Sequence, residues 1–276
     1  MKCIKIFRSI IANLIVAVIS ITCLYPIIWL IYSSMKTSAE FDANVISLPS
    51  VWNMDNFKKV LEISNMGRYM MNSIFTAVCS VLIILLFSFI IGYFLARYQF
   101  RGRGVIYGCF LVGMLIPVHS LMIPIYVIFS KLGLCDNKIT LILPYVAFQM
   151  QVAMYIVEIY IHSIPQEVEE AAAIDGAKFS TILFRIILPM AIPALTTAGI
   201  IAFFYCWNEF SFALVLTTQE KLRTIPLGLA MFKGSYTTNY PMLMAAMTIA
   251  IAPALVLYGC FSKNIMNGML AGAVKG

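Results

Sequence analysis

The sequence predicts an all-α membrane protein with six transmembrane helices. Hydrophobic residues make up 62% of the 276 residues and charged residues only 11%, against roughly 45–50% and about 25% in soluble domains. A soluble fold of this size cannot hide so much apolar surface from water, whereas lipid does not penalise it. Six apolar runs have the length of about 20 residues that a helix needs to cross a bilayer. They lie at residues 10–32, 73–95, 105–130, 139–161, 192–216 and 242–261.

The pattern within these runs favours helices over strands. Transmembrane β-strands are short segments that alternate polar and apolar side chains, but residues 81–93 are apolar on all sides. The first run follows Lys2, Lys5 and Arg8. It is too long for the core of a signal peptide and has no small-residue cleavage site, so we expect it to stay in place as the first span.

The basic residues predict the orientation of the chain. The net charge is +7, but the basic side chains cluster at the ends of apolar runs, which excludes a nucleic-acid partner. Arg97, Arg101 and Arg103 share one short loop, and three more basic residues lie within the first eight positions. Since Lys and Arg next to a span favour the cytoplasmic side, both termini are predicted to be cytoplasmic.

The residue sets of a metal site or an enzyme do not occur in the sequence. The seven cysteines lie mostly inside apolar runs without paired spacing and are predicted to be small core residues. The two histidines, His119 and His162, lie on different segments, and there is no phosphate-binding Gly-x-x-x-x-Gly-Lys-Ser/Thr loop. We predict no catalytic residue, no metal and no cofactor in this chain. An intramembrane enzyme and a stand-alone secondary transporter remain alternatives for the function of the chain.

The loop between the fourth and fifth runs has strong local helix signals. Ser163 and Gln166 have capping-box spacing, with Pro165 in the first turn. Three acidic residues stand where the helix dipole favours negative charge, namely Glu167, Glu169 and Glu170. Gly176 occupies a left-handed cap position, and a second helix is expected over residues 178–187. By physics alone, this acidic helix–turn–helix is equally a connector or a docking element.

The spacing within this loop resembles the "EAA" signature of the permease subunits of ATP-binding-cassette (ABC) importers. The sequence reads Glu170-Ala171-Ala172, three residues, Gly176, nine residues, and Ile186-x-Leu188-Pro189. In that family the loop is a cytoplasmic coupling helix that docks into a cleft on the ATPase. The resemblance implies the type I importer permease fold. It also implies the coupling residues Glu167, Glu170, Ala171, Ala172, Asp175, Gly176, Ala177, Ile186, Leu188 and Pro189.

Motifs in the spans are similar to those of carbohydrate-uptake permeases of the maltose and multiple-sugar type, in particular the smaller of their two permeases. The matching segments are Asn72-Ser73, Leu95-Ala96-Arg97, Leu115-Ile116-Pro117, Trp207-Asn208-Glu209-Phe210 and Thr224-Ile225-Pro226-Leu227-Gly228. One departure is Phe261-Ser262-Lys263, where relatives usually carry a glutamine followed by a basic residue.

The resemblance implies a permease subunit that imports a carbohydrate across the bacterial cytoplasmic membrane. Its implied partners are a second, larger permease, two ATP-binding subunits that hold ATP and Mg, an extracytoplasmic solute-binding protein and membrane lipid. We expect a span with a long external loop (residues 1–69), a permease core (70–262) and a cytoplasmic tail (263–276). At the end of the tail, Lys275 and Gly276 are expected to reach the ATPase. Related importers also carry glycerol phosphate, so a non-sugar solute is the alternative.

Three polar or aromatic residues lie together inside the fifth run: Trp207, Asn208 and Glu209. Sugars are bound by hydrogen bonds and by aromatic faces, and this triplet offers both, so it is a candidate for the translocation pathway. An ionisable residue within a span is a functional candidate by default. The alternative is a brace or gate against the partner permease. The resemblance favours this gate, because in maltose-type transporters most sugar contacts come from the larger permease.

Overall fold

The computed structural model describes residues 2–235 and 239–273, with side chains for 9–230 and 239–261. This part of the chain is helical and contains no strand. Its α-helices are α1 (Lys2–Ser33), α2 (Ser38–Ala43), α3 (Asp55–Ile63), α4 (Met66–Arg97), α5 (Arg103–Leu115), α6 (Met122–Lys131), α7 (Ile142–Ser163), α8 (Glu167–Ile174), α9 (Phe179–Thr181), α10 (Leu188–Asn208), α11 (Ser211–Leu216), α12 (Ile225–Ser235) and α13 (Tyr240–Ala273). Two 3₁₀ turns, η1 (Val118–Leu121) and η3 (Glu220–Leu222), and a π-helix, η2 (Ile182–Ile187), complete them.

Five described helices are long and apolar enough to cross a membrane. They are Ser9–Ser33, Met66–Arg97, Ile142–Ser163, Phe179–Asn208 and Tyr240–Phe261. A sixth crossing results if the bent pair Arg103–Leu115 and Val118–Lys131 is one span. The predicted all-α fold with six spans is confirmed in this sense.

The third span is broken where the sequence predicts one continuous run. The two halves meet at 97°. Ile116 is extended at φ −78° and ψ 118°, and Pro117 follows it. A proline disfavours the helical conformation of the residue before it and has no N–H for the helix ladder. The Ile116–Pro117 step therefore ends α5, and α6 starts in a new direction.

The fifth span is displaced towards the N-terminus relative to the prediction. The expected separate helix at 178–187 is continuous with the span, through α9 and the π turn η2 into α10. The wider π turn lies just before Pro189, whose ring and missing N–H do not fit a regular α turn. The span ends at Asn208 rather than at residue 216, because Glu209 is extended (φ −67°, ψ 126°) and the short α11 follows.

The chain divides into two compact units. The first comprises residues 1–67 and 228–252. Within it, the segment after α1 folds around Lys36, whose side chain is 1% exposed. Its Nζ donates to the carbonyls of Asn44 (3.0 Å) and Val45 (3.3 Å) and lies 5.5 Å from the ring of Tyr32. A buried lysine thus organises the loop predicted to be external.

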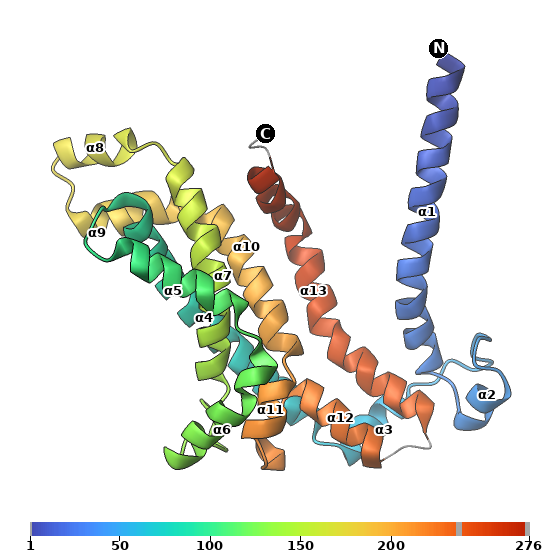
Figure 1. The fold of residues 1–276 in the computed structure, drawn as a ribbon. Helices are drawn as coiled ribbons and strands as arrows, with labels where there is room; N and C mark the ends of the chain where they lie inside the picture. The colour runs from blue at the N-terminus through green and yellow to red at the C-terminus, as the bar shows by residue number, and fades with distance from the viewer. Residues whose placement is uncertain (1, 236–238, 274–276) are drawn as a thin grey trace. The chain divides into compact units, whose positions relative to one another are not determined.

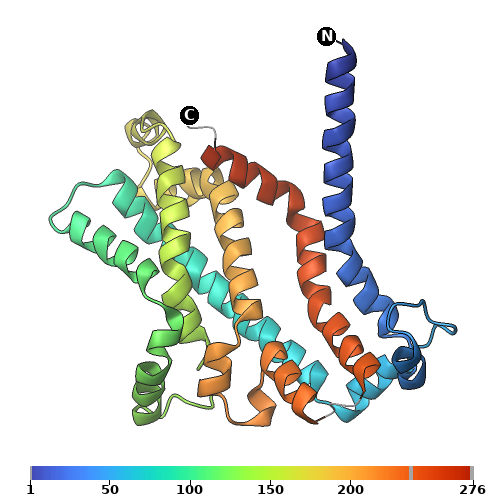
Figure 2. The ribbon, with the colours of Figure 1, turned by 45° about the vertical axis from the view of Figure 1, so that its right-hand side comes forward.

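The second unit, residues 68–227 and 253–276, contains the helices that carry the candidate sites. Helix α7 packs against α10 and α5. The α8 helix lies at one end of α7, and α6 and α11 lie at the other (Figure 1 and Figure 2). Close approach of α4 to α7 depends on Gly92, since a Cβ there would lie 3.2 Å from the backbone nitrogen of Glu158.

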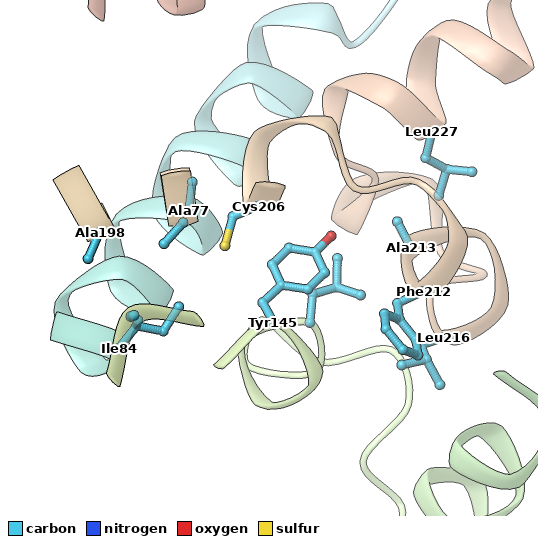
Figure 3. Close-up of a cluster of buried hydrophobic side chains, with 12 residues drawn as sticks. Ala77, Ile84, Tyr145, Ala198, Cys206, Phe212, Ala213, Leu216 and Leu227 are labelled. Carbon is cyan, nitrogen blue, oxygen red and sulfur yellow. The ribbon is translucent and has the colours of Figure 1, made fainter. Parts of the chain in front are cut away.

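Small residues let the helices of this unit pack closely around Tyr145. Figure 3 shows its ring between Cys206 and Ala77 on one side and Phe212, Ala213 and Leu216 on the other. Small side chains at helix interfaces are the usual basis of close packing in membranes, where water does not drive helices together. A second buried cluster, near α8, is formed by Phe89, Tyr93, Ala96, Val157, Ile161, Ile164, Ile182, Leu183, Ile187 and Ala191.

Candidate functional site

The predicted coupling loop folds as α8 followed by a left-handed turn at Gly176 (φ 79°). The N–H of Ala177 donates to the carbonyl of Ala172 (2.9 Å), and the N–H of Gly176 donates to that of Ala173 (3.0 Å). These two bonds form a Schellman motif, which satisfies carbonyls that the end of a helix leaves free. The predicted glycine cap is therefore confirmed.

The start of α8 differs from the prediction. Gln166 is the N-cap residue and makes no side-chain capping bond, and Pro165 precedes the cap rather than lying in the first turn. The hydroxyl of Ser163 donates instead to the carbonyl of Tyr160 at 2.6 Å. Ser163 is the last residue of α7, so its hydroxyl finds an acceptor in the preceding turn of its own helix. The predicted capping box is wrong.

The predicted coupling residues divide between an outward and an inward face. On α8, Glu167, Glu170, Ala171 and Ile174 follow helical three-and-four spacing and are exposed, Ile174 by 85%. These four residues are called the outer face of α8 below. Beyond them, Asp175, Gly176 and Pro189 are also exposed. The remaining predicted residues pack against the second buried cluster: Ala172, Ala177, Ile186 and Leu188.

An ion pair that the sequence analysis missed anchors α8. Arg97, the last residue of α4, donates from Nε to Oε1 of Glu169 at 2.6 Å, and the Tyr93 hydroxyl donates to Oε2 at 2.7 Å. A second nitrogen of Arg97, Nη2, donates to the carbonyl of Ile164 at 2.7 Å. The only available signal was the four-residue spacing of Tyr93 and Arg97, which places both on one face of a helix. Nothing local pointed to Glu169 as their partner.

The intramembrane triplet does not act as one cluster. Trp207 is 3% exposed and its ring stacks on Phe203, with centroids 5.6 Å apart and planes at 15°. Asn208 is exposed and donates to the carbonyl of Phe204 at 2.9 Å. Glu209 is 8% exposed and turns into the core. The triplet therefore separates into a packed ring, an exposed amide and a buried carboxylate.

Polar groups hold the Glu209 carboxylate from two directions. The hydroxyl of Tyr145 donates to Oε2 at 2.8 Å, and the N–H of Phe212 donates to Oε1 at 2.7 Å. The N–H of Ala213 also reaches Oε2, at 3.3 Å. The carboxylate thus caps α11 and joins it to α7, and removal of the carboxylate would leave these buried donors without their acceptor.

A groove that Glu209 helps to line combines aromatic side chains with hydrogen-bonding groups. Its volume is about 540 Å³. It is lined by Val118, His119, Phe204, Tyr205, Asn208, Glu209, Phe210 and Ser211. The hydroxyl of Tyr205 is buried and has no hydrogen-bond partner within the described residues. No lysine or arginine occurs among the described residues that line the groove.

Two further predictions concern the tail and metal binding. Lys275 and Gly276 lie outside the described residues. Within the described part of the chain, no group of three or more His, Cys, Asp or Glu side chains could hold a metal ion.

The spans and the anchored helix with its exposed outer face define a multi-pass membrane protein of the permease class. The sequence profile described as "Binding-protein-dependent transport system inner membrane component" matches residues 88–271. The chain belongs to this family and is a transport subunit of an ABC importer, as the resemblance of the loop implied.

Relatives and solved structures extend this similarity over nearly the whole chain. A putative ABC transporter permease protein, ORF2 of Caldicellulosiruptor sp. (strain Rt8B.4), is 38% identical over 252 residues, 91% of each chain. The diacetylchitobiose uptake system permease protein NgcG of Streptomyces coelicolor is 31% identical over 93% of this chain and 85% of its own. A crystal structure of a bacterial ABC transporter involved in the import of the acidic polysaccharide alginate matches with a TM-score of 0.79. The identity there is 27%, over 94% of this chain and 96% of that chain.

Proposed function

We propose that this subunit imports a carbohydrate. We also propose that a separate ATPase docks on the outer face of α8 and transmits its ATP-driven conformational change through it. The outer face carries the proposal for coupling, because two carboxylates, one alanine and the exposed apolar side chain of Ile174 lie on a helix whose other face is anchored. The small side chain of Ala171 permits close approach of a partner, and the carboxylates of Glu167 and Glu170 offer acceptors to basic groups. ATP and Mg would be held by that partner.

The substrate class is supported by relatives and by the groove. Relatives include uptake systems named for diacetylchitobiose and for trehalose and maltose. The aromatic side chains of Phe204, Tyr205 and Phe210 line the groove together with Asn208, and this combination suits an uncharged sugar. The described residues that line the groove offer no lysine or arginine to a phosphate ester, and the carboxylate of Glu209 would repel its negative charge. This disfavours glycerol phosphate.

The proposed assembly follows the binding-protein-dependent family. It consists of this chain, a second and larger permease, two ATP-binding subunits and an extracytoplasmic solute-binding protein. In the proposed orientation the α8 end of the second unit faces the cytoplasm together with both termini. The arginines at positions 97, 101 and 103 close to that end support it, because basic residues next to spans favour the cytoplasmic side.

Transport by the reconstituted importer tests the substrate. The complete importer in proteoliposomes, with its solute-binding protein, is offered labelled neutral oligosaccharides, alginate oligosaccharides and glycerol 3-phosphate. We expect ATP-dependent accumulation of a neutral sugar. Accumulation of glycerol 3-phosphate alone would contradict the substrate class, and uptake by this chain without ATP would indicate a secondary transporter.

Docking of the ATPase on α8 is tested separately. In Ala171→Trp a bulky ring projects from the outer face, so we expect the amount of co-purified ATPase to fall at least about tenfold, equivalent to about 1.4 kcal/mol. Ala147→Trp, at an exposed position on α7, is the control and should retain the ATPase. Full retention in Ala171→Trp would remove this face from the docking site.

A further inference from the structure

Few side chains attach α8 to the neighbouring helices, because no residue of α8 is fully buried. Glu169 makes the polar contacts, with Arg97 at 2.6 Å and Tyr93 at 2.7 Å. The Arg97 and Glu169 side chains are only 6% and 16% exposed. Hydrogen bonds between charged groups are about twice as strong as neutral ones, and burial reduces competition from water. This ion pair is therefore a rigid link between α4 and α8.

Arg97 extends the same link to α7. Its planar guanidinium reaches Glu169 and the carbonyl of Ile164, the C-cap residue of α7, at the same time. Less than two turns earlier in α4, Gly92 touches α7 so closely that a Cβ would lie 3.2 Å from a backbone nitrogen. At this end of the second unit, we therefore expect α4, α7 and α8 to move together as one rigid group.

The other end of α4 is also tied by polar contacts. The side-chain amide of Asn72 donates to the carbonyls of Lys221 and Arg223, each at 2.9 Å. The hydroxyl of Ser73 accepts the N–H of Ile225 at 2.8 Å. Since α4 has 32 residues, it spans about 48 Å at the usual rise of an α-helix. It links the α8 end of the second unit to the segment 221–225 at the opposite end.

We propose that Glu169 and Arg97 are the positioning pair that makes α4 follow α8 during the ATP-driven cycle. The proposal rests on the proposed docking of the ATPase at the outer face of α8, and it assigns a different task to the inner face. Without the pair, the outer face of α8 still binds the ATPase. A displacement of α8, however, no longer moves α4 and the segment 221–225 with it.

The number of ATP molecules hydrolysed per solute imported tests this proposal. Glu169→Gln keeps the size of the side chain but removes its charge. We expect this ratio to rise by roughly fivefold or more, the lower range of typical coupling effects, while the ATPase remains bound. Arg97→Lys cannot reach both acceptors as a guanidinium does and should give an intermediate ratio. Glu158→Gln is the matched control, because its buried carboxylate on α7 contacts His162 at 3.2 Å and not α8.

Each outcome decides between the proposal and its alternatives. An assembled Glu169→Gln importer with a wild-type ratio would overturn the role of the pair. If that variant does not assemble, the Arg97→Lys ratio decides, and a wild-type value there overturns it equally. A rise of the same size in Glu158→Gln would show a general loss of helix packing instead. Absence of ATP-driven uptake by the wild-type importer would contradict the proposed function itself.

Discussion

The hydroxyl of Tyr145 donates a 2.8 Å hydrogen bond to Oε2 of Glu209, between residues 64 positions apart in the chain. The two backbone N–H groups of Phe212 and Ala213 share the same carboxylate. Glu209 thereby ends α10, starts α11 and joins both to α7. Three hydrogen bonds thus hold the carboxylate in place, which supports the interpretation of Glu209 as a brace.

Replacement of Glu209 tests this interpretation. Glu209→Ala leaves the Tyr145 hydroxyl and two N–H groups without their acceptor, so we expect a loss of about 1–3 kcal/mol for each unsatisfied group. Thermal unfolding in detergent measures it. Glu209→Gln retains one acceptor oxygen and should lose less. Wild-type stability of Glu209→Ala, together with wild-type substrate-stimulated ATPase activity of Glu209→Gln, would remove Glu209 from both the brace and the pathway.

Close packing of α4 on α7 makes Gly92 sensitive to substitution. In Gly92→Ala the new Cβ would lie 3.2 Å from the backbone nitrogen of Glu158 and from Cγ1 of Val157. Backbone atoms cannot move aside easily, so we expect destabilisation by about 1–3 kcal/mol, seen as a lower midpoint of thermal unfolding. Gly108→Ala is the control, since a Cβ at Gly108 meets no atom within 4 Å. Equal midpoints for the two variants would show that the helices can separate without cost.

The left-handed turn after α8 requires glycine at position 176. Gly176→Ala places a Cβ at φ 79°, which costs about 1–2 kcal/mol. We expect faster amide hydrogen exchange, corrected for intrinsic rates, at positions 176 and 177, whose N–H groups are the two donors of the Schellman motif. Gly176→Asn should be milder, because asparagine tolerates this conformation better. Unchanged exchange in the alanine variant would contradict the strained turn.

Asp136 fastens the loop at residues 217–219, and its charge should make this loop sensitive to acid. Its carboxylate accepts hydrogen bonds from the N–H groups of Thr218 (2.7 Å) and Gln219 (2.9 Å) and from the Thr218 hydroxyl (2.5 Å). Burial by itself raises the pKa of Asp136, but these bonds and the charge of Lys221 outweigh it and hold the pKa below the ordinary 3.8. The stabilisation is therefore complete above the ordinary value and is lost as the pH falls through the lowered one.

Hydrogen exchange of the Thr218 and Gln219 amides checks this dependence. Corrected for intrinsic rates, we expect constant protection above about pH 4 and a decline below it. Asp136→Asn tolerates the left-handed backbone of this position (φ 54°) and removes only the charge. Its protection should be lower and independent of pH in this range. A wild-type decline that begins near neutral pH would assign the effect to another group.

The C-terminal tail is expected to contact the ATPase, as the family resemblance implies for Lys275 and Gly276. Deletion of residues 271–276 should reduce both ATPase coupling and uptake, measured in the reconstituted importer. The deletion should leave the thermal unfolding of the spans unchanged. Wild-type uptake and coupling in the shortened protein would contradict this assignment.

The sequence by itself determined which segments enter lipid and where the surface helix α8 ends. Hydropathy is additive along the chain, so the apolar runs located the spans, and the φ of Gly176 follows from a local rule for helix ends. The sequence did not correctly locate the break within the third span or the end of the fifth span. Proline at 117 is a local signal for a break, but the 97° angle between the two halves and the end of the fifth span at Asn208 are set by how the segments that follow pack.

Only the tertiary structure decided which polar groups meet. Arg97 and Glu169 are 72 residues apart, and Tyr145 and Glu209 are 64 apart, so no local pattern pairs them. The same holds for the division of the coupling residues between an exposed and a packed face, since Glu169 and Glu170 are neighbours with opposite surroundings. A charged side chain in a helix can be placed on a face by sequence spacing, but its partner depends on which helix packs against that face.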